Sequence, residues 1–146
     1  MPLALSVVTQ ERTVLERRDV LRLIVPTTEG QITVLPSHAP LMASLAIGEL
    51  VVVVPGQQIP LAIHGGFIQV ARDEVTVLAD AAEHVEEIDE QRAEAARERA
   101  QRRLAGPRAG PEAVDLLRAQ LALQRALVRL RVRRRRGGAT GVPSAR

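Results

Sequence analysis

The stretch Ile88-Asp89-Glu90-Gln91-Arg92-Ala93 marks the point where the pattern of the chain changes from strands to helices. Before it, short clusters of Val, Leu and Ile are broken by Gly and Pro, and after it Ala and Leu recur at helical spacing. Asp89 suits an N-cap, because its carboxylate can accept a backbone N–H and is favoured by the positive helix end. Arg92 falls in the first turn, where that end disfavours a cation. The stretch therefore predicts a strand-to-helix boundary and a partner for Arg92.

The composition limits what the chain can be. Its 146 residues suit one domain, or a small domain with an appendage. Hydrophobic residues make up 46%, but Phe67 is the only aromatic residue, so Val, Leu, Ile and Ala must build the core. The absence of cysteine excludes disulfides and thiolate metal sites. No apolar run is long enough to span a bilayer, and the start lacks a signal-peptide pattern, so we expect a cytosolic location.

Charge is unevenly distributed along the chain, and all of the basic residues other than His are Arg. Residues 1–85 hold five Arg and nine acidic residues, a net charge of −4, whereas residues 86–146 hold fifteen Arg and eight acidic residues, a net charge of +7. The densest basic run is Arg129–Arg136. Guanidinium groups can neutralise phosphates, but no aromatic residue is interleaved for base stacking. A solvated helix end is the preferred interpretation, and nucleic-acid or membrane-surface binding are the alternatives.

The first part of the chain has the pattern of an all-β fold. Short apolar runs recur at a spacing of roughly 8–12 residues with turn signals between them, which is typical of a sandwich or barrel. Gly65-Gly66 is expected to form a turn or a close backbone approach. Strands are expected at Leu3–Val8, Val20–Val25 (ended by Pro26), Gln31–Leu35, Leu50–Val54, Ile59–His64, Phe67–Val70 and Val75–Leu78.

The second part has the period of two amphipathic helices. Residues 105–111 form a Gly/Pro breaker between them, which predicts an antiparallel hairpin. The first expected apolar stripe is Ala93, Ala96, Ala100 and Leu104, and the second is Val114, Leu117, Leu121 and Val128, broadened by Leu116, Leu127 and Leu130. Because alanines bury little area, the hairpin should be only marginally stable by itself. Such an element could fold down in one condition and open in another.

The sequence offers no catalytic or metal-binding constellation. His38, His64 and His84 are scattered without metal-ligand spacing, and no Ser stands in a nucleophile motif. We therefore expect no enzymatic activity, no required cofactor and no metal site.

The remaining candidate site is a set of arginines on the hairpin. Arg92 and Arg99 share one face of the first helix, and Arg125 and Arg129 share one face of the second. In an antiparallel pair these groups could line one groove near Asp89, a setting suited to phosphate oxygens. The alternative is an ion-pair face that only solubilises the hairpin, and the residues by themselves favour it.

Several segments in order resemble the epsilon subunit of the bacterial F-type ATP synthase, across residues 3–132. These segments are Glu29-Gly30, residues 35–41 (LPSHAPL), Gly65-Gly66-Phe67, residues 75–79 (VTVLA), the Ile88-Asp89-x-x-Arg92-Ala93 motif, and the helices 98–104 and 118–130. The resemblance implies an α+β chain: a β-sandwich of about ten strands over 1–86, a regulatory helical hairpin over 87–136, and a flexible basic tail over 137–146.

The resemblance also implies a function. The chain would be a non-catalytic central-stalk subunit of a proton-translocating ATP synthase, peripheral to the cytoplasmic face of the bacterial plasma membrane. Its sandwich would bind the gamma subunit and the rotor c-ring. Its hairpin could extend into the alpha/beta catalytic head and inhibit ATP hydrolysis, and ATP binding to the folded hairpin would relieve this inhibition. No nucleic-acid partner is implied; a sandwich protein whose Arg-rich hairpin binds nucleic acid is the rival hypothesis, and a stand-alone ATP sensor is a third.

Two sets of residues carry these implied contacts. The interface set is Glu29, Gln31 and His38, with Gln31 in place of a commonly acidic residue. The nucleotide set is Glu83, Ile88, Asp89, Arg92, Ala93, Arg99, Arg125 and Arg129. Because this set is complete, the resemblance moves the preferred interpretation of the arginines from an ion-pair face to a regulatory ATP site.

Overall fold

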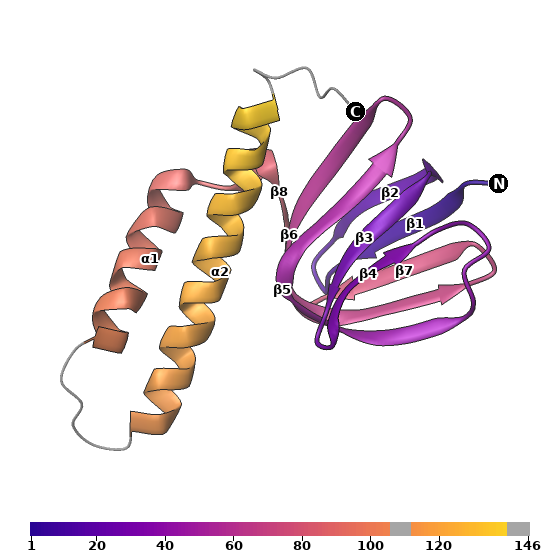
Figure 1. Cartoon of the computed structure of the whole chain (residues 1–146). Helices are drawn as coiled ribbons and strands as arrows, with labels where there is room; N and C mark the ends of the chain where they lie inside the picture. The colour runs from indigo at the N-terminus through magenta and orange to yellow at the C-terminus, as the bar shows by residue number, and fades with distance from the viewer. Residues whose placement is uncertain (106–111, 140–146) are drawn as a thin grey trace. The chain divides into compact units, whose positions relative to one another are not determined.

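A computed structural model describes residues 1–105 and 112–139, which belong to two compact units, Met1–Val85 and Glu86–Arg146 (Figure 1). The strands are β1 (Leu3–Val8), β2 (Thr13–Val20), β3 (Arg22–Thr27), β4 (Gly30–Val34), β5 (Leu41–Val54), β6 (Gln57–Ala71), β7 (Glu74–Ala79) and β8 (Ala82–His84). A short 3-10 helix, η1 (Val85–Glu87), precedes the helices α1 (Glu90–Ala105) and α2 (Glu112–Ala139). The expected order, a β-sandwich followed by a helical hairpin, is confirmed.

The strands form one sheet that folds over on itself. Their order is β2-β1-β7-β6-β5-β3-β4, and β8 pairs with β6 beyond the end of β7. The β1–β7 pair is parallel and the other pairs are antiparallel. The strands β5 and β6 pair along their whole length and take part in both layers of the sandwich (Figure 1). One end of this long pair adjoins β7, β1 and β2, and the other end adjoins β3, β4 and β8.

The expected strand number was too high, because the described residues hold eight strands and not ten. Gly65 and Gly66 lie inside β6 with φ of 83° and 121°, so the strand kinks there without ending. The Gly65 carbonyl accepts a hydrogen bond from the Asp80 N–H at 3.0 Å, where β6 changes its partner from β7 to β8. Of the two expectations for this glycine pair, the close backbone approach is correct.

The region after β1 also differs from the expectation. The strand β2 covers residues 14–19, for which the sequence pattern predicts no strand. Its register against β1 shifts twice, and such bulges disturb the alternation by which a strand is recognised. The expected strand Val20–Val25 is divided at Leu21, since Val20 ends β2 and β3 begins two residues later, at Arg22.

Pro26 lies inside β3 rather than after its end. It stands opposite Gln31 of β4, and the register between β3 and β5 shifts beside it, so the missing N–H falls at an irregularity. A Cβ on Gly48 of β5 would lie 2.6 Å from the Pro26 Cβ. The proline ring therefore occupies space that only a glycine neighbour leaves open.

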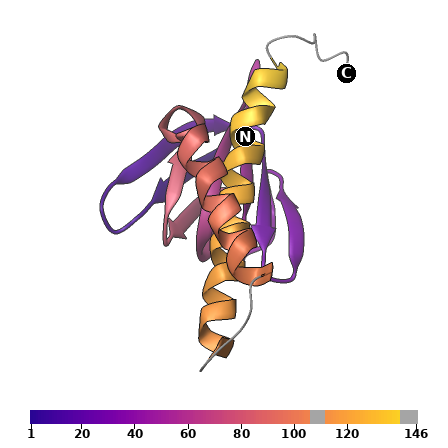
Figure 2. The same ribbon diagram turned by 90° about the vertical axis from the view of Figure 1, so that its left-hand side faces the viewer.

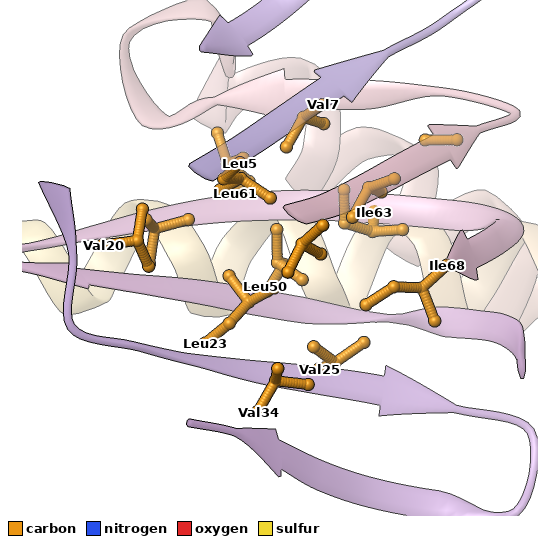
Figure 3. Close-up of a cluster of buried hydrophobic side chains, with 14 of the residues drawn as sticks. Leu5, Val7, Val20, Leu23, Val25, Val34, Leu50, Leu61, Ile63 and Ile68 are labelled. Carbon is orange, nitrogen blue, oxygen red and sulfur yellow. The ribbon is translucent and has the colours of Figure 1, made fainter. Parts of the chain in front are cut away.

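The core of the sandwich is aliphatic. Alternate residues of β1, β3, β5, β6 and β7 point inward, among them Leu5, Leu23, Leu50, Leu61 and Ile63, all at most 2% exposed (Figure 3). Each fully buried Val, Leu or Ile side chain stabilises the fold by about 1.5–3 kcal/mol. The sandwich thus has a substantial core of its own without aromatic residues.

The two helices pack side by side as an antiparallel pair (Figures 1 and 2). Small residues seven apart are buried on both helices, Ala93 and Ala100 on α1 and Ala119 and Ala126 on α2, each at most 3% exposed. We call these four residues the alanine seam. The seam lets the helix axes approach closely but removes little apolar area from water.

The second expected stripe was partly wrong. Leu117 and Leu127 are 55% and 39% exposed, whereas Val128 and Leu130 are buried as expected. The alanines of α2 face α1, so Leu117 and Leu127, which lie on other sides of the helix, remain exposed to solvent. The helix α2 is assigned through Ala139, three residues past the expected end of the hairpin, a difference within the usual uncertainty of a fraying terminus. Of the expected breaker at 105–111, Ala105 ends α1, and residues 106–111 lie outside the described residues, as do residues 140–146 of the expected tail.

Candidate functional site

The start of α1 is built by three of the motif residues. The Asp89 carboxylate accepts a hydrogen bond from the Arg92 backbone N–H at 3.1 Å, as an N-cap does. Ile88 and Ala93, at 4% and 3% exposure, occupy the two positions that flank a capped first turn in a hydrophobic staple. The predicted N-cap is confirmed. Ile88, Asp89 and Ala93 therefore have structural reasons to be present, while the exposed Arg92 side chain has none in the helix start.

The four candidate arginines lie on the same side of the hairpin. Since residues advance by about 100° around a helix, Arg92 and Arg99 fall on one flank of the alanine seam on α1. Arg125 and Arg129 fall on the adjoining flank of α2, because the helices are antiparallel. Within the described part of the chain, no ion pair is formed by the guanidinium groups of Arg92, Arg99 or Arg125. The flank can thus present several cationic groups to an anionic ligand.

The opposite flank of the seam holds an ion-pair network that the sequence did not predict. Arg134 of α2 approaches Glu90 at 3.7 Å and Glu94 at 3.3 Å, both on α1. Glu94 also pairs with Arg97 one turn further along α1. A spacing of four between two acidic residues at a helix start was the available signal, but only the packing of the helices identifies their partner.

Glu83 belongs to the sandwich, on β8, and not to the hairpin. Its carboxylate lies 2.8 Å from His64 Nε2, and the His64 side chain is 4% exposed. A second histidine, His84, bonds through Nε2 to the Val14 carbonyl at 2.7 Å, which ties β8 to β2. Two of the scattered histidines therefore hold the end of the sandwich together, and Glu83 already has a partner there.

The predicted interface residues lie in the β3–β4 turn, on β4 and in the connection from β4 to β5. Glu29 is exposed in the β3–β4 turn, where the Thr28 N–H bonds to the Ser44 carbonyl at 3.0 Å, and Gln31 is exposed on β4. His38 is half-buried, and its Nδ1 lies 2.7 Å from the Ala39 carbonyl.

The loop that carries His38 is fixed by its preceding residue. The Ser37 N–H donates to the Asp73 carboxylate in the β6–β7 turn at 2.6 Å. Both loops are thereby anchored to strands β5, β6 and β7.

These strands carry an exposed apolar patch, formed by Met42, Phe67 and Leu78, which the sequence did not single out. The side chains are 69%, 57% and 54% exposed. Phe67 stands directly opposite Leu78 on β7 and opposite Ser44 on β5, two residues from Met42 on the same face. The only aromatic residue of the chain is thus exposed among other apolar groups, which marks a docking surface more often than chance scatter.

A charged hollow on β1, β2 and β7 is a poorer candidate. It is lined by Ser6, Glu16, Arg18 and Glu74 among others, and by Arg17. Arg17 donates two hydrogen bonds to Asp19, at 2.9 and 2.7 Å, and these bonds lower the pKa of the Asp19 carboxyl. The Arg17 charge is therefore already matched, and the hollow is not an anion site.

The chain thus belongs to the class of two-part proteins in which a β-sandwich is followed by two helices, and a family model matches each part. The sequence model described as "ATP synthase, Delta/Epsilon chain, beta-sandwich domain" matches residues 2–85, and that described as "ATP synthase, Delta/Epsilon chain, long alpha-helix domain" matches residues 86–133. The chain belongs to the ATP synthase epsilon-chain family. The resemblance stated from the sequence is confirmed.

Relatives support this membership along most of the chain. The ATP synthase epsilon chain of Herpetosiphon aurantiacus is 46% identical over 132 residues, covering 90% of this chain and 94% of that one. The epsilon chain of Solibacter usitatus is 47% identical over 128 residues, covering 88% and 92%. The expectation that the chain is an epsilon subunit of ATP synthase is confirmed.

A solved structure has the same fold. A chain in the Euglena gracilis mitochondrial ATP synthase, a structure described as OSCP/F1/c-ring, superposes with a TM-score of 0.72 at 26% identity, covering 84% of this chain and 76% of that one. Among the described helices, none is long and apolar enough to cross a bilayer. The described residues contain no group of three or more His, Asp or Glu side chains placed to hold a metal ion.

Proposed function

We propose that this chain is a non-catalytic rotor subunit in the central stalk of a proton-translocating ATP synthase, peripheral to the cytoplasmic face of the bacterial plasma membrane. The sandwich binds the gamma subunit and the c-ring and turns with them. The hairpin extends along gamma into the alpha/beta head in an inhibitory state and folds back in a permissive one. Membership of the epsilon-chain family and the likeness to a chain from an assembly with F1 and c-ring support this role.

The observation that carries the proposal is the contrast in packing between the two units. The sandwich is built around large buried aliphatic side chains, whereas the buried residues of α1 are both alanines and those described on α2 are Ala119 and Ala126 with Val128, Leu130 and Val132. A rotor-bound body needs the first kind of packing, and a regulatory element that opens and closes needs the second, because little apolar area is exposed when it opens.

The apolar patch of Met42, Phe67 and Leu78 supports a permanent partner for the sandwich. Its occupant in this proposal is gamma. Glu29 and His38 lie in loops anchored beside the patch, through Ser44 and Asp73 respectively. These loops and Gln31 would contact gamma and the c-ring around the margin of the apolar contact.

ATP is the proposed regulatory ligand of the folded hairpin. Arg92, Arg99, Arg125 and Arg129 would bind its phosphates, and Asp89 and Ala93 would shape the site at the helix start. Glu83, the remaining polar member of the implied nucleotide set, belongs to β8 of the sandwich, where its carboxylate contacts His64. ATP bound only to the folded hairpin stabilises that state by mass action.

Reconstitution with an alpha/beta/gamma subcomplex tests the proposed function. The full chain and a chain that ends at residue 85 should both bind gamma, but only the full chain should inhibit ATP hydrolysis. Equal inhibition by the shortened chain would show that the hairpin is not the inhibitor. Failure of both chains to bind gamma, with salt-sensitive RNA or DNA binding by the full chain, would favour the nucleic-acid hypothesis instead.

Calorimetric titration of the isolated chain with ATP tests the nucleotide site. The substitution Arg92→Ala should abolish binding, because it removes the phosphate partner that lies closest to the capped start of α1. Arg102→Ala is the matched control, since Arg102 lies on the side of α1 opposite to the alanine seam and is exposed. An unchanged ATP affinity in Arg92→Ala would refute the assignment.

A further inference from the structure

Arg134 joins the two ends of the hairpin that lie furthest apart in the sequence. Its guanidinium group is within 3.7 Å of the Glu90 carboxylate and donates to the Glu94 carboxylate at 3.3 Å. Glu94 is shared with Arg97, so four charged side chains form one network across the helix pair. One cation on α2 thus meets two anions on α1, and these carboxylates stand one helical turn apart.

Three of these four charges, all but that of Arg97, stand in the half of their helix that favours their sign. Glu90 and Glu94 occupy the first two turns of α1, near its positive end, and Arg134 lies in the last turns of α2, near its negative end. The antiparallel arrangement brings these two ends together. The positive end of α1 therefore supports Glu90 in the first turn, in addition to its direct attraction to Arg134.

The network lies at the end of the hairpin that is furthest from the connection between the helices. The connection between the helices is at residues 106–111, so Arg134 holds the opposite end of α2. This helix has 28 residues, about 40 Å at the rise of an α-helix. Between the connection and the network lies the alanine seam, whose small side chains remove little apolar area from water. The free end of α2 is where separation of the helices would begin, and the network is placed at that end.

We infer that Glu90, Glu94 and Arg134 form an ionic latch that holds the hairpin closed and releases it as ionic strength rises. This inference rests on the proposed function, in which the hairpin opens. The latch lies on the flank opposite to Arg92, Arg99, Arg125 and Arg129, so it acts on the same closed state without occupying the proposed nucleotide site. Its effect is screened by salt, because the side chains of Glu90 and Arg134 are 51% and 58% exposed.

Native-state amide hydrogen exchange of the isolated full-length chain tests the latch. It reports rare openings, so it needs no populated open state. At low salt, Arg134→Ala should speed exchange of the α2 amides around Leu130 and Val132 by about two- to fivefold, the range of exposed ion pairs. At about 1 M salt, where the Debye length is roughly 3 Å, the difference should vanish. Because alanine is the better helix former, faster exchange cannot come from helix propensity.

Two further variants separate the latch from a general loss of charge. Arg131→Ala removes an exposed arginine from the same helix and should exchange like the unaltered chain. The Glu90→Gln, Glu94→Gln double variant should exchange at least as fast as Arg134→Ala, since it also loses the Arg97 pair, and adding Arg134→Ala to it should cause no further change. Exchange in Arg134→Ala that equals that in Arg131→Ala would overturn the latch. Since no partner is present, that failure is distinct from a failure to bind gamma or to inhibit hydrolysis.

Discussion

At Gly66 the backbone of β6 comes so close to β7 that no side chain fits between the strands. A Cβ there would lie 2.1 Å from the Leu78 carbonyl oxygen and 2.7 Å from the Ala79 Cα, at a φ of 121°. Gly66→Ala should therefore lower the free energy of unfolding by about 3 kcal/mol or more, from steric overlap together with an unfavourable φ. Urea denaturation of the two chains measures this difference.

Gly30→Ala is the matched control for this substitution. Gly30 has the same φ of 121°, but nothing lies within 4 Å of the position of its Cβ. The free energy of unfolding of Gly30→Ala should fall only by the cost of the unfavourable φ, about 1–2 kcal/mol. Equal losses in the two variants would mean that the close approach of β6 to β7 does not limit the residue at 66.

Single residues show where sequence reasoning succeeds and where it stops. The N-cap role of Asp89 follows from local chemistry, and the structure confirms it at 3.1 Å. The glycine pair before Phe67 was ambiguous, because a kink inside a strand and a turn between strands need the same backbone freedom. The pairing of Arg134 with Glu90 could not be predicted, since it depends on how two separate helices align.

The hairpin is an element whose stability depends on a close fit of small residues. Ala126 is fully buried in the alanine seam. Ala126→Leu should force the helices apart and destabilise the closed hairpin by about 1–3 kcal/mol, as overpacking does. Thermal melting followed by far-UV circular dichroism should show an earlier loss of helical signal in this variant.

Ala105→Leu provides the comparison, because Ala105 is exposed at the end of α1. Its effect should stay within about 0.5 kcal/mol. A helical signal in Ala126→Leu that melts with or above that of Ala105→Leu would contradict the close approach of the helices at the seam.

Elements were predicted well where one physical rule decides them. Turn residues and β-branched runs located most strands, and the change of period located both helices. The strand β2 was not predicted, because polar side chains such as Glu16 and Arg18 line its exposed side and two bulges interrupt the alternation of buried and exposed residues. Leu117 and Leu127 were predicted to be buried on α2 but are exposed. The face of α2 that is covered is the one that packs against α1, and the hydrophobicity of α2 alone does not identify it.

At the scale of the whole molecule, the two units have different kinds of surface for different partners. The sandwich exposes Met42, Phe67 and Leu78 together, although its own core is complete without them. The hairpin exposes charge on both flanks of its seam. In the proposed function the first surface is a permanent contact with gamma, and the second is adjusted by salt and nucleotide.

The apolar patch yields the last prediction, on assembly. Phe67→Ser should weaken binding to gamma by about tenfold, because a large aromatic anchor at the centre of a patch contributes most to such contacts. The free energy of unfolding should change little, since the side chain is 57% exposed. Titration of an alpha/beta/gamma subcomplex with each chain measures the affinity.

Leu21→Ser is the control, because it also replaces an exposed apolar side chain by serine but lies outside the apolar patch. Leu21 is 47% exposed, between β2 and β3, and its N–H bonds to the Val53 carbonyl in the layer of the sandwich away from the patch. It should bind gamma as the unaltered chain does. If Phe67→Ser binds as tightly as Leu21→Ser, gamma docks elsewhere on the sandwich, and the loops of Glu29 and His38 become the leading candidates for that contact.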